Sequence, residues 1–183
     1  QTFEVGFDAT FKENIQFDVV YFNRKEVDAI IYNNTTYSYG NSSSDASGLE
    51  LNVRVAATSF LSINSSYTYI DSNNLEDFND YIPANKFVTG IDITPFENAF
   101  LNFTYRNVGE RTIFDRYGSF GTLGDDVILE EYQVLDFMAN YKVLEDTVTF
   151  FIAATNLLNE DYDDIFGYET RGRNYKVGVR LQF

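Results

Sequence analysis

The segment TFEVGFDATF, residues Thr2–Phe11, decides the fold class of this chain. Its odd-numbered residues are all apolar, from Phe3 to Phe11, and the residues between them are polar or glycine. Successive side chains of a β-strand point to opposite faces of the sheet, whereas a helix repeats its apolar residues every three or four positions. The alternation therefore predicts a strand with one apolar face and one polar face.

The same alternation returns along the chain, and none of the apolar faces carries an Asp, Glu, Lys or Arg. It predicts about nine strands of roughly ten residues, the length that a tilted strand needs to cross a bilayer. Strands of soluble proteins are usually shorter, and a charge on the apolar face is costly at the bilayer midplane. The further segments are Ile15–Tyr21, Leu49–Val55, Leu61–Tyr69, Phe87–Ile93, Leu101–Tyr105, Leu135–Tyr141, Val148–Ala154 and Tyr175–Phe183.

The composition favours strands and argues against catalysis. The chain has 14 Tyr and 18 Phe, and aromatic rings pack well on a pleated surface. It has no Cys and no His, so it lacks a disulfide framework, a thiolate zinc site, the commonest metal ligand and the usual general base. We therefore expect no enzymatic activity, no metal site and no cofactor.

Charge and hydropathy narrow the choice of partners. The net charge of −15 would repel the phosphates of nucleic acid, so we expect no nucleic-acid partner. No run of 18 or more apolar residues exists, so no membrane-spanning helix is expected. Hydropathy alone would suggest a soluble protein, but transmembrane strands alternate and give only a weak hydropathy signal.

Short and long links alternate between the expected strands, and much of the acid lies in the long ones. Outer-membrane barrels sort their links in this way, with periplasmic turns at one end and extracellular loops at the other, whereas a soluble sandwich has no reason to do so. The short links are Lys12–Asn14, Ala57–Ser59, Thr94–Asn98 (where Pro95 is expected to break the ladder) and Lys142–Asp146. The long links are Arg24–Ala46, Asp71–Ala84, Arg111–Glu130 and Leu157–Gly172.

The C-terminal segment, KVGVRLQF, ends on an aromatic residue. It resembles the outer-membrane assembly signal, with its polar residue at Lys176, glycine at Gly178, hydrophobic residue at Leu181 and terminal aromatic at Phe183. An exposed terminal strand offers an unpaired edge with which the barrel assembly machinery can pair. The alternative is an amphipathic last strand that happens to end in Phe.

The preceding segments are similar to the closing hairpin of TonB-dependent receptors. The similarity is carried by Asn156–Tyr162 (NLLNEDY), Gly167-Tyr168 and Gly172-Arg173. Earlier, Ser47–Glu50 resembles the family's re-entry from a long loop into a strand, and Pro83–Asn85 resembles its entry to a later strand. The resemblance covers essentially the whole chain and is closest in style to the cobalamin and ferric-siderophore receptors.

The resemblance implies an antiparallel transmembrane β-barrel of about 22 strands with a plugged lumen. Residues 1–183 would form the last part of it, because an odd number of strands does not close an antiparallel barrel and the family's N-terminal plug is not in this chain. The implied function is the uptake of a scarce nutrient, such as siderophore-bound iron or cobalamin, by TonB-coupled active transport across the outer membrane.

The implied partners are the lipid bilayer, the protein's own plug domain, the TonB energy-coupling complex acting through that plug, the barrel assembly machinery and a small nutrient ligand. The long links would then be extracellular and the C-terminus periplasmic. Three rivals stay open: a passive porin or channel, a soluble β-sandwich adhesin, and a scaffold barrel without a ligand.

Candidate ligand contacts lie in the long links. Tyrosine gives a large contact area at low entropic cost, and arginine recognises anions. The alternatives are an aromatic girdle or loop packing for the rings, and a surface ion pair with Asp115 for the arginines. Acid in Glu160–Asp164 would suit Ca²⁺, but its spacing does not match an EF-hand, and solvated acid is the simpler interpretation. The candidates are Tyr37, Tyr39, Arg111, Phe114, Arg116, Tyr117 and Phe120.

Overall fold

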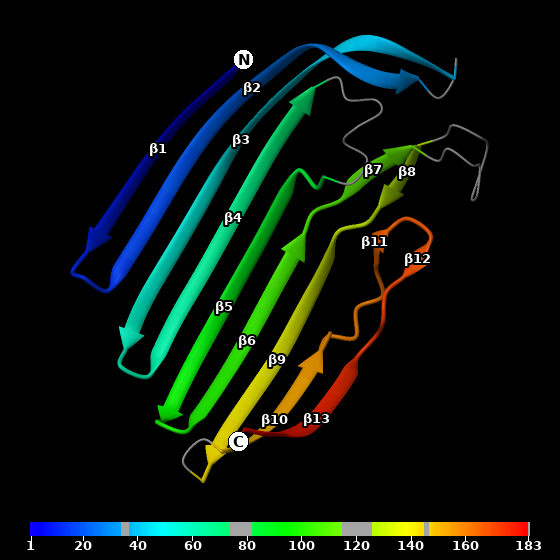
Figure 1. The fold of residues 1–183 in the computed structure, drawn as a ribbon. Coiled ribbons are helices and arrows are strands. Elements are labelled where there is room, and N and C mark those ends of the chain that lie inside the picture. Colours follow the sequence, from blue (N-terminus) through cyan, green and yellow to red (C-terminus); the bar gives the residue numbers. More distant parts are fainter. Residues whose placement is uncertain (34–36, 74–81, 115–125, 145–146, 183) are drawn as a thin grey trace.

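The computed structural model describes residues 1–33, 37–73, 82–114, 126–144 and 147–182 (Figure 1). All of the regular secondary structure in these ranges is β-strand. Within the same ranges, no helix has the length and the hydropathy that crossing a membrane requires.

Nine strands form one antiparallel sheet in which each strand pairs with the one before it. The sheet is strongly curved and its strands run obliquely, with β1 at one edge and β13 at the other (Figure 1). The two edge strands do not pair with each other, so the sheet is open. Its strands are β1 (Thr2–Phe11), β2 (Ile15–Asn33), β3 (Ser38–Thr58), β4 (Leu61–Asn73), β5 (Asn85–Phe96), β6 (Ala99–Val108), β9 (Tyr132–Val143), β10 (Val148–Thr155) and β13 (Asn174–Leu181).

Two small hairpins complete the fold, and both lie at the end of the sheet where the long links run (Figure 1). β7 (Arg111–Phe114) pairs with β8 (Asp126–Leu129) in the link between β6 and β9. β11 (Asp163–Ile165) pairs with β12 (Tyr168–Glu169) in the link between β10 and β13. We call this end of the sheet the loop end.

All nine strands predicted from the alternation are confirmed, and the first has the predicted bounds. Three of the four short links are confirmed as tight turns at one end of the sheet, at residues 12–14, 59–60 and 97–98, whereas the fourth, Lys142–Asp146, falls partly outside the described residues. The predicted break at Pro95 is only partly correct, because β5 extends to Phe96. The register does shift between Ile93 and Phe96, since proline has no backbone N–H to donate to the ladder.

The prediction of a long polar loop between Arg24 and Ala46 is wrong. The ladder between β2 and β3 continues beyond that pair to Asn33 and Ser38, with one irregularity between Glu26 and Ala29. The assumed re-entry at Ser47–Glu50 therefore lies inside β3. The alternation does not predict these strand residues, because this part of the hairpin extends beyond the rest of the sheet and has no apolar face.

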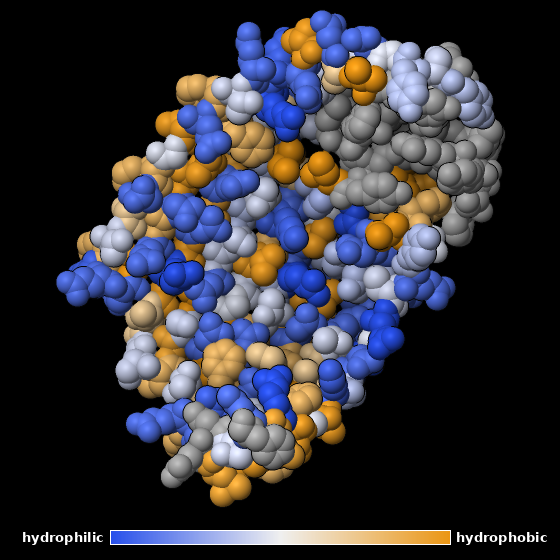
Figure 2. Space-filling model, viewed as in Figure 1, coloured by the Kyte–Doolittle hydropathy of each residue, from blue (hydrophilic) through white to orange (hydrophobic). Residues whose placement is uncertain are grey.

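The register sorts the side chains of the sheet into two faces. On the apolar face, Phe7 pairs with Val19, and Phe103 pairs with both Ile91 and Phe137. Many of these side chains are exposed, and Phe7 is 62% exposed. Figure 2 shows hydrophilic residues spread over the middle of the view and hydrophobic residues along its left and lower edges. A sheet that exposes so large an apolar face requires apolar surroundings.

The buried core lies at the loop end rather than within the sheet. The buried apolar side chains of the described residues are few, and most of them come from the ends of β6 and β9 and from the β7–β8 hairpin. They are Val108, Ile113, Leu129, Tyr132, Val134 and Ala154.

Candidate functional site

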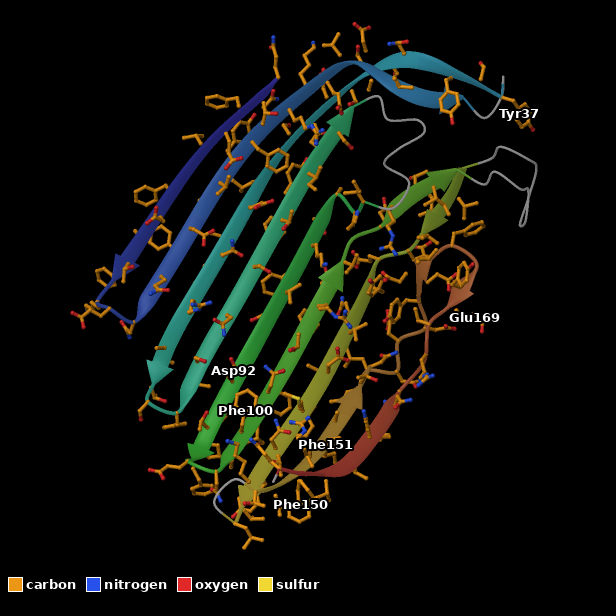
Figure 3. The ribbon with its side chains drawn as sticks, in the orientation of Figure 1. Tyr37, Asp92, Phe100, Phe150, Phe151 and Glu169 are labelled. Carbon is orange, nitrogen blue, oxygen red and sulfur yellow. The ribbon has the colours of Figure 1, made fainter. Side chains whose placement is uncertain are left out.

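A row of hydrogen-bonded side chains crosses the polar face from β3 to β6. Arg54 Nε donates to Asn64 Oδ1 at 2.9 Å, and Asn64 Nδ2 donates to Asp92 Oδ2 at 3.3 Å. Asn102 Nδ2 donates to the other oxygen of Asp92 at 2.7 Å. We call these four residues the polar belt, and Asp92 is labelled in Figure 3. Since each contact joins neighbouring strands, the belt ties four strands together through side chains alone.

A hollow of about 620 Å³ lies over this face. Its volume falls in the range of small-molecule sites, but such sites are mostly apolar and enclose their ligand. Most of the residues around this hollow are polar, including Asp8, Asp18, Asn52, Arg54 and Asn64, although apolar atoms also line it, and it is open. Its chemistry suits a large polar surface lying against it better than a small enclosed ligand.

The polar face carries no net charge. The register places seven acidic and seven basic side chains on it, so the charge of −15 lies in the turns and at the loop end. Mixed signs do not suggest a charge-selective filter. The acidic residues are Glu4, Asp8, Asp18, Glu26, Glu50, Asp92 and Asp136, and the basic ones are Arg24, Arg54, Lys86, Arg106, Lys142, Lys176 and Arg180.

At the loop end, Arg111 joins two hairpins. Its side chain is 2% exposed, and its Nη2 donates to the backbone carbonyl oxygens of Asp163 and Asp164, each at 2.9 Å. The Asp164 carboxylate lies 3.5 Å away. Arg111 belongs to β7 and the two aspartates to β11, so one buried guanidinium links these two elements. We call Arg111, Tyr132, Tyr162, Asp163 and Asp164 the loop-end cluster.

Tyr132 also contacts the β11–β12 hairpin and the residue just before it. Its hydroxyl donates to Asp164 Oδ1 at 2.7 Å, and its ring stacks on that of Tyr162 with centroids 4.1 Å apart. The Arg111 guanidinium lies 5.6 Å from the centre of the Tyr132 ring, a cation–π distance. The sequence did not single out Tyr132, because a tyrosine at the start of an alternating strand is an ordinary strand residue.

Tyr132 lies beyond the apolar part of the sheet. Next to it, Asn107 of β6 pairs with Gln133 of β9 on the face that is apolar elsewhere, and both of these residues are polar. Burial, followed by the hydrogen bond to Asp164, raises the pKa of Tyr132 to about 12. The phenol therefore stays protonated and remains a hydrogen-bond donor at any physiological pH.

Asn156 turns the chain from β10 toward the loop-end cluster. It is 3% exposed and adopts a φ of 53°, in the left-handed region that asparagine tolerates. The side-chain Nδ2 of Asn156 donates to the backbone carbonyl of Glu160 at 2.8 Å, and the side-chain Oδ1 accepts from the Glu160 N–H at 2.9 Å. Its own N–H donates to Asp136, whose other oxygen binds Arg106 at 3.2 Å. The NLLNEDY motif is therefore a structural turn that delivers Tyr162 to Tyr132.

The predicted ligand contacts do not gather into one described site. Tyr37 and Tyr39 are each 77% exposed, near the tip of the β2–β3 hairpin (Tyr37 is labelled in Figure 3). Arg111 is buried in the loop-end cluster instead, so ligand contact through it stays a prediction that its position disfavours. Phe114 ends β7, but the placement of its side chain is not described. The remaining candidates, Arg116, Tyr117 and Phe120, lie outside the described residues.

The acidic link at Glu160–Asp164 is engaged by protein groups. Asp164 binds Tyr132 and Arg111, and Glu160 binds Asn156 through its backbone. Across the described ranges, no three or more His, Cys, Asp or Glu side chains are placed together to hold a metal ion.

The terminal motif lies on the edge strand β13. Lys176 and Gly178 are on the polar face, Leu181 is on the apolar face and 55% exposed, and Phe183 lies outside the described residues. Gly178 pairs with Phe151 of β10, whose ring covers the glycine so closely that an added Cβ would clash with it. The close approach of this ring gives a physical reason for a glycine at that position.

Replacing Gly178 with Ala is expected to destabilise the protein by about 1–3 kcal/mol, because the Phe151 ring must move to admit the new methyl group. The same substitution made in a Phe151→Ala background should cost much less. A double-mutant cycle by denaturant unfolding measures the coupling. An equal cost in both backgrounds would show that the ring is not the reason for the glycine.

The comparisons with known proteins agree with this geometry. Residues 1–157 match the family described as TonB dependent receptor-like, beta-barrel. No curated protein matches the chain significantly.

Solved structures with the same fold include three receptors. The ferric-catecholate import receptor Fiu from E. coli K12 matches 100% of this chain and 27% of its own, with a TM-score of 0.77 at 19% identity. The pyoverdine receptor FpvA from Pseudomonas aeruginosa PAO1 matches 100% of this chain and 29% of its own, with a TM-score of 0.81 at 15% identity. The siderophore receptor PirA from Acinetobacter baumannii matches 100% of this chain and 31% of its own, with a TM-score of 0.79 at 14% identity.

The chain thus spans less than a third of the length of these receptors. At such identities the likeness establishes the fold, whereas the match over residues 1–157 establishes the family. The resemblance noted in the sequence is confirmed by both comparisons. This chain belongs to the TonB-dependent receptor β-barrel family.

Proposed function

We propose that this chain is the last part of an outer-membrane receptor that captures a scarce nutrient and takes it up by TonB-coupled transport. The observation that carries the proposal is the single sheet with one exposed apolar face and one polar face, in a chain of this family. The apolar face would meet lipid. The long links would be extracellular and the C-terminus periplasmic.

The architecture argues against the β-sandwich alternative. A sandwich buries its apolar faces between two packed sheets. Here nine strands form one sheet, and Phe3, Phe7 and Val179 on its apolar face are each more than half exposed. Several strands also exceed ordinary soluble lengths, β2 with 19 residues and β3 with 21.

The open edges and the partial coverage support a larger barrel. Fiu, FpvA and PirA are each more than three times as long as the stretch matched by this chain. Plugged transporters of the outer membrane have about 22 strands, so β1 and β13 would pair with strands outside this chain. The plug would lie against the polar belt, and TonB would act through the plug.

The edge position of β13 supports the assembly signal. An exposed strand edge pairs readily with another strand, so the insertion machinery would engage β13 through its backbone. We assign the signal to Lys176, Gly178, Leu181 and Phe183.

Ligand capture is assigned to the exposed aromatic residues of the loop end. Tyr37 and Tyr39 offer large, rigid contact surfaces, and we retain Phe114, Arg116, Tyr117 and Phe120 as further contacts. We do not assign Arg111, because its guanidinium is occupied by β11. Fiu is described as a ferric-catecholate import receptor and FpvA as bound to pyoverdine, so ferric siderophores are the first ligands to test.

Uptake by the host bacterium tests the proposal. Deleting the receptor gene should abolish growth on one ferric siderophore, or on cobalamin, under limitation of that nutrient. Deleting TonB should give the same loss. Uptake that persists without TonB and rises linearly with ligand concentration would favour a passive channel, and unchanged uptake of every ligand would favour a scaffold barrel.

The membrane assignment has its own test. The purified receptor should need detergent and have an intact mass several times the 21.0 kDa of this chain. A monodisperse, detergent-free protein of 21.0 kDa would overturn the transmembrane assignment.

A further inference from the structure

The last two long links of the chain are joined by a buried guanidinium. Arg111 of β7 is 2% exposed, and it donates from one nitrogen to two successive backbone carbonyls of β11, 52 and 53 residues later in the chain. Contacts to carbonyl oxygens hold the backbone itself. The position of β11 therefore depends on Arg111 whatever side chains its residues carry.

Two further contacts hold the same segment. The Tyr132 hydroxyl binds the Asp164 carboxylate, and the Tyr132 ring stacks on Tyr162 just before β11. Tyr162 packs on the buried group formed by Val108, Tyr132 and Val134. The hairpin β11–β12 is thus fastened by a guanidinium, a carboxylate and an aromatic stack to a packed core.

The other long hairpin of the loop end is built differently. The described residues of β2 and β3 beyond Arg24 and Ala46 include no fully buried side chain, and Ile30 is 75% exposed. Strong fastening is therefore a specific feature of the β7–β8 and β11–β12 hairpins and not a general property of this end of the molecule.

We propose that Arg111 is a positioning residue that locks the β11–β12 hairpin to the base of β7–β8, so that the described parts of these two hairpins form one fixed unit at the loop end. Arginine suits this role because its guanidinium offers several donors in a rigid plane, whereas lysine is a point charge on a flexible stem. The lock acts within the protein, and it does not depend on which ligand the receptor takes up.

Hydrogen exchange on the full-length receptor in detergent micelles, without ligand, tests the lock. The variants are Arg111→Met, Arg111→Lys and Tyr132→Phe, and the control is Asp161→Ala, an exposed acid of the same link. In Arg111→Met, amides of residues 163–170 should exchange about tenfold faster, as expected for the loss of hydrogen bonds from a charged group. The exchange rates of the same amides in Arg111→Lys should be close to those in Arg111→Met, and Tyr132→Phe should raise them by a smaller factor.

Exchange in β10 and β13 should not change in any variant, and Asp161→Ala should match the parent protein throughout. Unchanged exchange of residues 163–170 in Arg111→Met and Tyr132→Phe would overturn the proposal. So would an equal acceleration across β9, β10 and β13, which would give Arg111 only a general role in stability. If Arg111→Met fails to fold, Arg111→Lys, which keeps the positive charge but removes the planar guanidinium that reaches β11, decides the matter.

Full protection in Arg111→Lys would show that charge suffices and that the planar group is not required. Because no ligand and no transport step enter this measurement, its failure is distinct from a failure of the proposed uptake function.

Discussion

Replacing Ile91 with Arg is expected to destabilise the folded protein by about 2–4 kcal/mol, the cost of a basic side chain at the bilayer midplane. Ile91 lies near the middle of β5 on the apolar face, where it pairs with Ile63 of β4 and Phe103 of β6. Denaturant unfolding of the full-length receptor in lipid bilayers measures the change.

Thr104→Arg is the matched control for Ile91→Arg. Thr104 follows Phe103 on β6 and therefore points to the polar face, where it pairs with Gly90 and with Asp136 of β9. An arginine there meets polar and acidic neighbours, so its cost should stay below about 1 kcal/mol. Equal costs for the two variants would show that the apolar face does not meet lipid.

Replacing Gly48 with Ala is expected to cost about 2–3 kcal/mol through overpacking. A Cβ at this buried position would lie 2.5 Å from the backbone carbonyl oxygen of Tyr69 and 2.5 Å from the Phe22 ring. The ring can turn aside, but the carbonyl belongs to the neighbouring strand β4. The two strands must therefore separate locally, and unfolding by urea or guanidinium measures the loss.

Gly40→Ala is the control for Gly48→Ala, because Gly40 lies on the same strand and a Cβ there would meet nothing within 4 Å. Its effect should stay within about 0.5 kcal/mol. Adding Phe22→Ala to Gly48→Ala should not restore stability, since the Tyr69 carbonyl remains. If both glycine variants cost the same, the close approach of β4 does not explain Gly48.

The role of Gly178 differs from that of Gly48 in a way that no local pattern reveals. Both glycines lie on the polar face opposite a phenylalanine of the adjacent strand. At Gly178 the obstacle is the ring of Phe151 alone, whereas at Gly48 a backbone carbonyl adds to it. Sequence reasoning noticed Gly178 through the terminal motif and Gly48 through a family resemblance, but it assigned neither a contact.

Alternation along the chain was sufficient to predict the strands and their two faces. Successive side chains of a strand face opposite sides, so a strand with one apolar and one polar face alternates at every second residue, and the bounds of Thr2–Phe11 were predicted from this alternation. The same pattern was silent on the outer parts of β2 and β3. Most of the described residues there are exposed, and a strand without an apolar face shows no two-residue period in its sequence.

The sequence alone was enough to predict the class of fold, the position of each strand of the sheet and the family, but not the extent of the link between Arg24 and Ala46. Each of the three follows from local periodicity or from a motif of a few neighbouring residues. The burial of Arg111 against β11 could be seen only in the folded molecule. The partners of Arg111 are backbone carbonyls 52 and 53 residues away. Every residue has a backbone carbonyl, so no residue type in the sequence indicates these partners.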